Sequence, residues 1–97
     1  MKFRFLPEAS DDLRKAIEYY EDCQEKLGLD FLIEFDKAIR RVVEYPQAWQ
    51  EISDNFRRCL LGRFPYGIIY SVESDCILIV SVMNLHQHPS TWKNRNS

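Results

Sequence analysis

The residues best suited to binding or catalysis lie in the second half of the chain, around a Phe-Pro-Tyr segment at positions 64–66. Arg57, Arg58 and Arg63 precede its proline with permanent positive charge, and Tyr66 ends it with a phenolic hydroxyl. Guanidinium groups bind phosphates and carboxylates through paired hydrogen bonds at every physiological pH. The arginines therefore support two interpretations: an exposed cationic strip that contacts a partner, or a solvated sheet face paired with helix carboxylates.

The two histidines, His86 and His88, are two positions apart and would share one face of a strand. Imidazoles can transfer protons or bind metals, but no cysteine or carboxylate lies close in the sequence to complete a metal site. The sequence also lacks a glycine-rich phosphate loop, G-x-S-x-G and H-E-x-x-H. We therefore expect no metal and no cofactor. Acid–base catalysis by the histidines remains an alternative to the interpretation that they are ordinary residues at a sheet edge.

An aromatic and basic segment follows near the end of the chain, with Trp92, Lys93 and Arg95. Trp92 either contacts a target or packs the end of the chain onto the sheet, and packing is the favoured interpretation. The two cations stay available to a partner in both cases.

Composition limits the classes of protein to consider. The chain has 97 residues, 45% of them hydrophobic, and a formal net charge of -2. This balance supports one packed domain over residues 1–97, whereas strong nucleic-acid binding by the isolated chain would call for a more basic protein. No apolar run approaches the roughly 20 residues that span a bilayer. Three widely spaced cysteines predict reduced thiols, so we expect a cytoplasmic protein with no membrane association.

The spacing of apolar residues predicts a strand over residues 2–6 and a helix over 8–27, which Gly28 ends. Asp30 is the expected N-cap of a second helix that stops at Tyr45-Pro46. The short connection between the two helices predicts an antiparallel hairpin.

After Pro46 the pattern changes from helical to strand-like. Strands are expected over 48–52, 56–61, 66–72 and 76–83, and the last is apolar almost throughout, which is typical of a central strand. The predicted class is α+β: an antiparallel, twisted sheet that has a mixed edge and an N-terminal strand, with a helical hairpin packed on one face.

At this level of detail the chain resembles the RelE/ParE family of toxins from type II toxin–antitoxin systems. The resemblance rests on the order and spacing of six segments. They are F-x-F-L-P-E-A-x-x-D-L at 3–13, A-x-x-Y-Y-E at 16–21, G-x-x-F-x-x-E at 28–34, A-I-x-x-V at 38–42, R-R-x-L-L-x-x-F-P-Y-x-I-x-Y at 57–70, and V-M-x-L-x-x-H-P-x-x-W-x-x-R at 82–95.

The resemblance implies a toxin held by a cognate antitoxin, which is expected to be a ribbon-helix-helix-like or similar DNA-binding protein. RelE-like members cleave mRNA on the ribosome, whereas ParE-like members are associated with DNA gyrase. Where relatives often carry H-L-R-R-H, this chain has Asn84, Leu85, His86, Gln87 and His88. Two fixed cations are therefore missing at the family's active edge, which favours ParE-like inhibition by binding.

Two alternatives remain. A RelE-like endoribonuclease would use Arg58, Arg63, Tyr66 and His88 around the scissile phosphate, and a degenerate member would keep antitoxin binding without toxicity. The antitoxin is expected to add a strand to a sheet edge, or to lay a helix beside the hairpin against Leu32, Val43 and Tyr45. The expected target-contact residues are Arg57, Arg58, Arg63, Tyr66, His86, His88, Trp92, Lys93 and Arg95.

Overall fold

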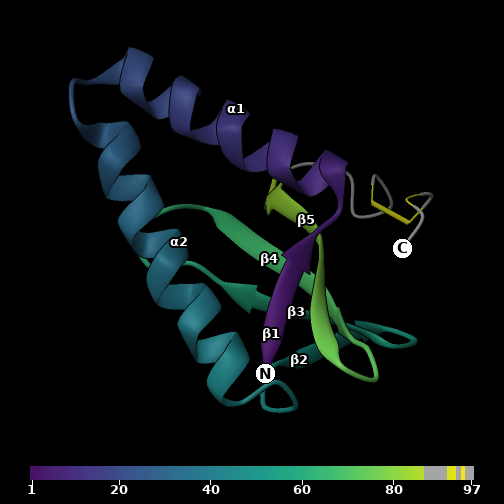
Figure 1. Ribbon diagram of the computed structural model, residues 1–97. Coiled ribbons are helices and arrows are strands. Elements are labelled where there is room, and N and C mark those ends of the chain that lie inside the picture. Colours follow the sequence, from purple (N-terminus) through teal and green to yellow (C-terminus); the bar gives the residue numbers. More distant parts are fainter. Residues whose placement is uncertain (87–91, 94, 96–97) are drawn as a thin grey trace.

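The computed structural model describes residues 1–86, 92, 93 and 95, in which two helices cover one face of a five-stranded sheet (Figure 1). The predicted α+β class and the helical hairpin on one face are therefore confirmed. The elements, in chain order, are β1 (Lys2–Phe5), α1 (Pro7–Cys23), α2 (Leu27–Glu44), β2 (Gln50–Ser53), β3 (Phe56–Leu60), β4 (Tyr66–Val72) and β5 (Cys76–Asn84).

The strands lie in the order β1-β5-β4-β3-β2. β1 runs parallel to β5, and the other neighbours are antiparallel, so the sheet has the expected mixed edge, which lies at the N-terminal strand. β4 is the middle strand of the sheet rather than β5. β5 is nevertheless flanked on both sides, and its residues from Ile77 to Met83 are buried, which explains its unbroken apolar pattern.

The junction between the helices differs from the prediction. α1 ends at Cys23, and Gly28 lies inside α2 instead of ending α1. Lys26 takes the left-handed conformation (φ 71°) that the sequence pattern assigns to the glycine. The carboxylate of Glu21 then accepts hydrogen bonds from the backbone N–H groups of Lys26 (3.0 Å) and Gly28 (3.1 Å). This carboxylate caps the start of α2, while Asp30 lies in its first turn.

Gly28 is required for a different reason, which is the close approach of the two helices. A Cβ atom on Gly28 would lie 2.7 Å from the backbone oxygen of Ile17. Gly28→Ala is therefore expected to lower the free energy of unfolding by about 1–3 kcal/mol, measured by urea denaturation. The matched control is Gly62→Ala, whose Cβ would meet only the end of the flexible Glu34 side chain. Equal stability of the two variants would contradict this explanation.

The buried side of the sheet contains an aromatic cluster that joins both helices to the turn before β4. The ring of Tyr20 on α1 stacks on Phe31 of α2 at 5.4 Å and contacts Phe64 edge-to-face at 4.8 Å. Tyr66 packs against Phe31 at 4.9 Å, which places Tyr66 on the face of the sheet that the helices cover. The packing role expected for Trp92 also holds, since Trp92 is buried and contacts Phe56 edge-to-face at 4.9 Å.

Tyr70 is fully buried in β4 and donates a 2.7 Å hydrogen bond from its hydroxyl to the backbone oxygen of Pro46. Burial raises the pKa of Tyr70 to about 12. Since the folded pKa exceeds the ordinary value of 10, the neutral phenol stabilises the fold fully below pH 10, and that contribution is lost between pH 10 and pH 12. The loss corresponds to at most about 3 kcal/mol. Urea denaturation between pH 10 and pH 12 should show that the free energy of unfolding falls more steeply for the wild type than for Tyr70→Phe. Parallel declines in the two proteins would contradict this role of the neutral phenol.

Candidate binding surfaces

The residues expected to form a catalytic site do not converge. Gly67 follows Tyr66 in β4, so a Cβ on Gly67 would point to the sheet face opposite the helices. That Cβ would meet the side chain of Arg58 at 2.9 Å. Arg58 and Tyr66 therefore lie on opposite faces of the sheet. Arg63 belongs to the same set and lies in the turn before β4, whereas His88 and the neighbouring Gln87 lie outside the described residues.

Two other arginines of the expected target-contact set are held by groups of this chain. Arg57 donates a 2.7 Å hydrogen bond to the backbone oxygen of Trp49. Arg63 lies 3.5 Å from the carboxylate of Asp30 on α2, and its guanidinium lies 5.5 Å from the centre of the Phe64 ring. These arginines are directed to separate parts of the surface, so the structure does not assemble them into one cationic strip.

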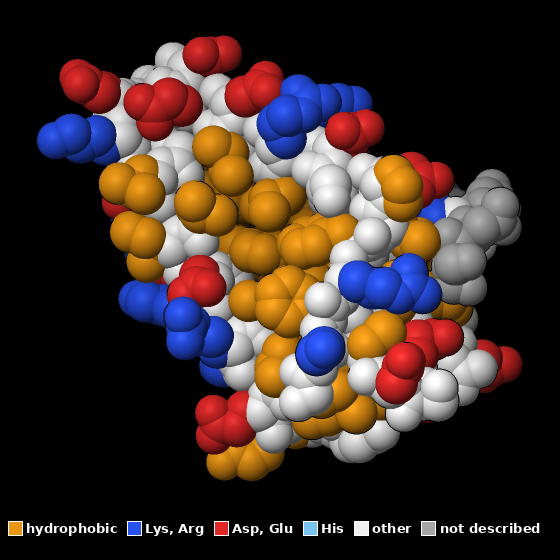
Figure 2. All heavy atoms as spheres, in the orientation of Figure 1, with side chains coloured by type: hydrophobic (Ala, Val, Ile, Leu, Met, Phe, Trp, Pro, Cys, Tyr) orange, Lys and Arg blue, Asp and Glu red, His pale blue; other side chains and the backbone are white. Residues whose placement is uncertain are grey.

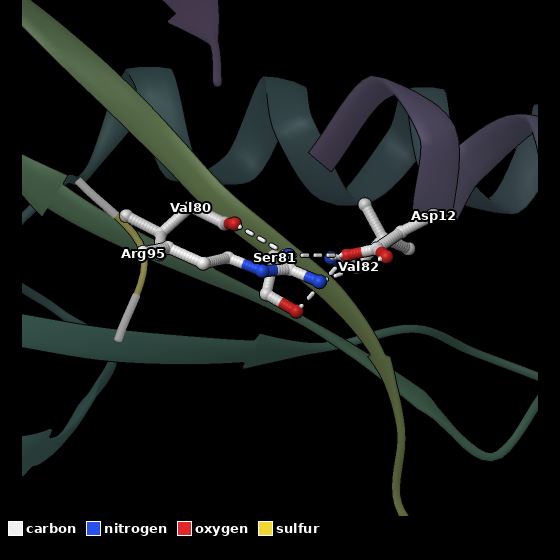
Figure 3. A network of polar contacts seen from close by, with 5 residues as sticks. All are labelled: Asp12, Val80, Ser81, Val82 and Arg95. Atoms are coloured by element: carbon white, nitrogen blue, oxygen red, sulfur yellow. Dashed lines mark hydrogen bonds and ion pairs between the residues drawn. The ribbon is translucent and has the colours of Figure 1, made fainter. Parts of the chain in front are cut away.

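Arg95 is also engaged within the chain, in a network that Figure 3 shows from close by. Its guanidinium contacts Asp12 of α1 at 2.6 and 3.1 Å and donates to the backbone oxygen of Val80 at 2.8 Å. Asp12 accepts further hydrogen bonds from the Ser81 hydroxyl and the Val82 backbone N–H, both at 3.1 Å. The side-chain hydrogen bond to Asp12 raises the pKa of Arg95 further above its ordinary value.

This network compensates for the early end of β1. The pairing of β1 with β5 stops at Phe5 opposite Ile79, and no other strand among the described residues lies beside the following part of β5 on that side. The carboxylate of Asp12 and the guanidinium of Arg95 supply the hydrogen bonds there that a longer strand would have made. Sequence reasoning missed Asp12, because a partner 83 residues away leaves no local signal.

A broad hydrophobic area lies between α1 and α2, with charged side chains around it (Figure 2). Within it, a groove of about 700 Å³ separates the start of β1 from the second half of α2. We call it the apolar groove. Val43 lies in its wall, and Leu32 and Tyr45 are exposed elsewhere on or beside α2. The apolar groove is lined by Met1, Lys2, Phe3, Asp36, Ile39, Arg40, Val43 and Glu44.

A second hollow of about 570 Å³ lies between α1 and the β4–β5 hairpin, and we call it the tyrosine cleft. It contains Tyr66 and His86 of the expected target-contact set. It also contains Lys15 and Tyr19, which sequence reasoning missed although their spacing of four residues places them on one face of α1. Its lining residues are Asp12, Lys15, Ala16, Tyr19, Tyr20, Pro65, Tyr66, Val82, Asn84 and His86.

Lys93 is exposed, and the backbone N–H of the exposed His86 donates to the Asn84 side chain at 2.8 Å. Among residues 1–86, 92, 93 and 95, no three potential ligand side chains cluster into a metal site. Neither helix in this part of the structure is long and apolar enough to cross a bilayer.

Comparison with known proteins shows which family the chain is similar to. The model of the ParE toxin of type II toxin–antitoxin systems, parDE, matches residues 3–89. Among solved structures, the chromosomal ParDE toxin–antitoxin system from P. aeruginosa is similar, with a TM-score of 0.65 and 16% identity over 89% of this chain and 97% of that chain. At this identity the structural similarity shows the fold alone. No curated protein matches the chain.

Proposed function

Since the chain belongs to the ParE toxin family of type II toxin–antitoxin systems, we propose that it inhibits DNA gyrase by binding the enzyme, without breaking bonds itself. A cognate antitoxin neutralises it until release. In this proposal the protein acts in the cytoplasm, where its target works on DNA.

The observation that carries the proposal is the dispersal of the cationic side chains. Cleavage of RNA requires positive charges and proton-transfer groups that converge on one phosphate. Here Arg58 and Tyr66 lie on opposite sheet faces, while Arg63 and Arg95 form ion pairs with Asp30 and Asp12. Such an arrangement supports docking better than phosphoryl transfer.

The antitoxin half of the proposal rests on the apolar groove and the hydrophobic area around it. Phe3, Leu32 and Tyr45 are large apolar side chains that stay between 41% and 60% exposed. A hydrophobic area of this kind marks an interaction site more often than free surface. We expect a ribbon-helix-helix-like antitoxin to cover it with a segment that folds on binding.

One observation favours the RelE-like alternative. The Nε atom of Arg58 is buried and has no hydrogen-bond partner among the described residues. A rearrangement that exposed this unpaired N–H would let it bind a phosphate, which a ribosome-bound mRNA would supply. The alternative therefore predicts a strong effect of Arg58→Ala on toxicity through transcript cleavage.

The proposal is tested with purified toxin and purified gyrase in a supercoiling assay. Inhibition with accumulation of cleaved DNA is expected, and addition of the antitoxin should restore supercoiling. Unchanged supercoiling at toxin concentrations that arrest growth would contradict the proposal. Unchanged supercoiling together with normal growth would indicate the degenerate member.

A further inference from the structure

We infer that the tyrosine cleft binds an acidic side chain on an extended segment of the toxin's protein target. The inference rests on the proposed function in one respect, which is that the target is a protein. The cleft is separate from the apolar groove, so one surface can recognise the target while the other belongs to the antitoxin.

The separation follows from the geometry of α1. Lys15 and Tyr19 line the tyrosine cleft, whereas Leu13 and Ile17 line a smaller hollow against Phe5 of β1, and neither lining shares a residue with the apolar groove. At 3.6 residues per turn, these two pairs project from clearly different sides of the helix. A partner seated between α1 and β1 therefore leaves the tyrosine cleft open.

The charge of the cleft favours an anion. Asp12 is the carboxylate in its lining, and Arg95 neutralises it at 2.6 Å while Ser81 and Val82 also donate to it. The ammonium group of Lys15 forms no ion pair with any residue that the structure describes. The uncompensated charge in the cleft is therefore positive.

The same cleft offers a place for extended backbone. Beyond Ile79 none of the described residues forms a strand beside the outer edge of β5, where the Val80 oxygen and the Val82 N–H are bonded to the side chains of Arg95 and Asp12. Alternate residues of a strand direct their backbone groups to the same side, so the backbone of Asn84 faces this edge as well. A short extended segment can lie beside the Asn84 end of this edge with an acidic side chain directed to Lys15.

The surroundings favour a protein segment over a nucleic acid. Lys15 is the one lysine or arginine in the lining, while the exposed carboxylates of Asp11 and Glu18 lie close by on the same helix. Both acids pair with Arg14, so this part of α1 adds no further unpaired cation, and a chain of phosphates would gain one favourable contact for its several charges. One carboxylate, in contrast, matches the single cation. Tyr19, Tyr20 and Tyr66 add the aromatic area that is typical of protein–protein contacts.

The test is an NMR titration of the ¹⁵N-labelled full chain with two probes, an acetylated tetraglutamate peptide and a dT tetranucleotide. The peptide should produce saturable shifts at the amides of Lys15, Tyr19 and Asn84. Lys15→Glu should weaken its binding at least about fivefold, and the matched control Lys37→Glu, an exposed lysine on α2, should leave it within about twofold.

Three outcomes would overturn the inference. They are shifts confined to other regions or absent, equal peptide binding by Lys15→Glu and the wild type, and tighter binding of the tetranucleotide at the same amides. The titration uses no gyrase, so its result is independent of the supercoiling assay. If the protein binds the peptide in the cleft but leaves gyrase unaffected, gyrase is not the target, and the inference about the cleft stands.

Discussion

Replacement of Leu32 and Val43 by aspartate is expected to weaken antitoxin binding by about 100-fold or more. Leu32 is 41% exposed on α2, and Val43 lies in the wall of the apolar groove. When the antitoxin covers this area, the two introduced carboxylates would lose their water and be buried without partners. Their desolvation strongly disfavours the complex. Isothermal titration calorimetry with the purified antitoxin measures the change. In cells, the variant should remain toxic when the antitoxin is present.

The matched control is Leu60→Asp, because Leu60 is an exposed leucine (50%, against 41% for Leu32) that lies on β3, outside the lining of the apolar groove. It should bind the antitoxin with nearly wild-type affinity. Because the side chain of Leu32 is exposed, Leu32→Asp alone should leave folding intact, so that a change in affinity reports on antitoxin binding. Equal antitoxin affinity for Leu32→Asp and the wild type, with both folded, would show that the antitoxin docks elsewhere.

Asp12→Ala is expected to lower the free energy of unfolding by about 3 kcal/mol. The change removes the acceptor of the Val82 backbone N–H and leaves the guanidinium of Arg95 with only its hydrogen bond to the Val80 oxygen. Both side chains of the pair are only about one-fifth exposed. Arg95→Ala should have a smaller effect, because Asp12 keeps its two hydrogen bonds from Ser81 and Val82. Urea denaturation of the single and double variants gives the coupling energy.

Asp11→Ala is the control for this prediction, since Asp11 is exposed and lies 3.4 Å from Arg14 in a solvated pair. Its effect should stay below about 0.5 kcal/mol. A similar loss of stability in Asp11→Ala and Asp12→Ala would contradict the assigned role of the Asp12–Arg95 pair in joining α1 to β5.

Much of the architecture can be predicted from local pattern. The stripe of Ala9, Ala16 and Phe31 on the two helices and the apolar run of β5 fix which faces are buried, and the resemblance to the family is confirmed over residues 3–89. The junction at Gly28 could not be predicted, because the glycine avoids a clash with another helix instead of ending its own. The local sequence pattern does not distinguish a glycine that ends a helix from one that lets two helices approach closely.

The candidate site is harder to predict than the fold, for a physical reason. Arg58 and Tyr66 belong to different strands, so the face that each occupies depends on the pairing of β3 with β4 and on the turn between them. The partners of Arg63 and Arg95 are likewise set by tertiary packing. In contrast, Lys15 and Tyr19 share a helix face, and their spacing carried a signal that points to the tyrosine cleft.

The central claim is that this chain acts by docking and leaves phosphodiester bonds intact. The most direct measurement follows a labelled mRNA in a translating extract after addition of the purified toxin, with the cleavage sites mapped at nucleotide resolution. The account predicts intact transcripts for the wild type at concentrations that inhibit gyrase. Cleavage within codons on the ribosome, abolished by Arg58→Ala in a folded protein, would contradict it.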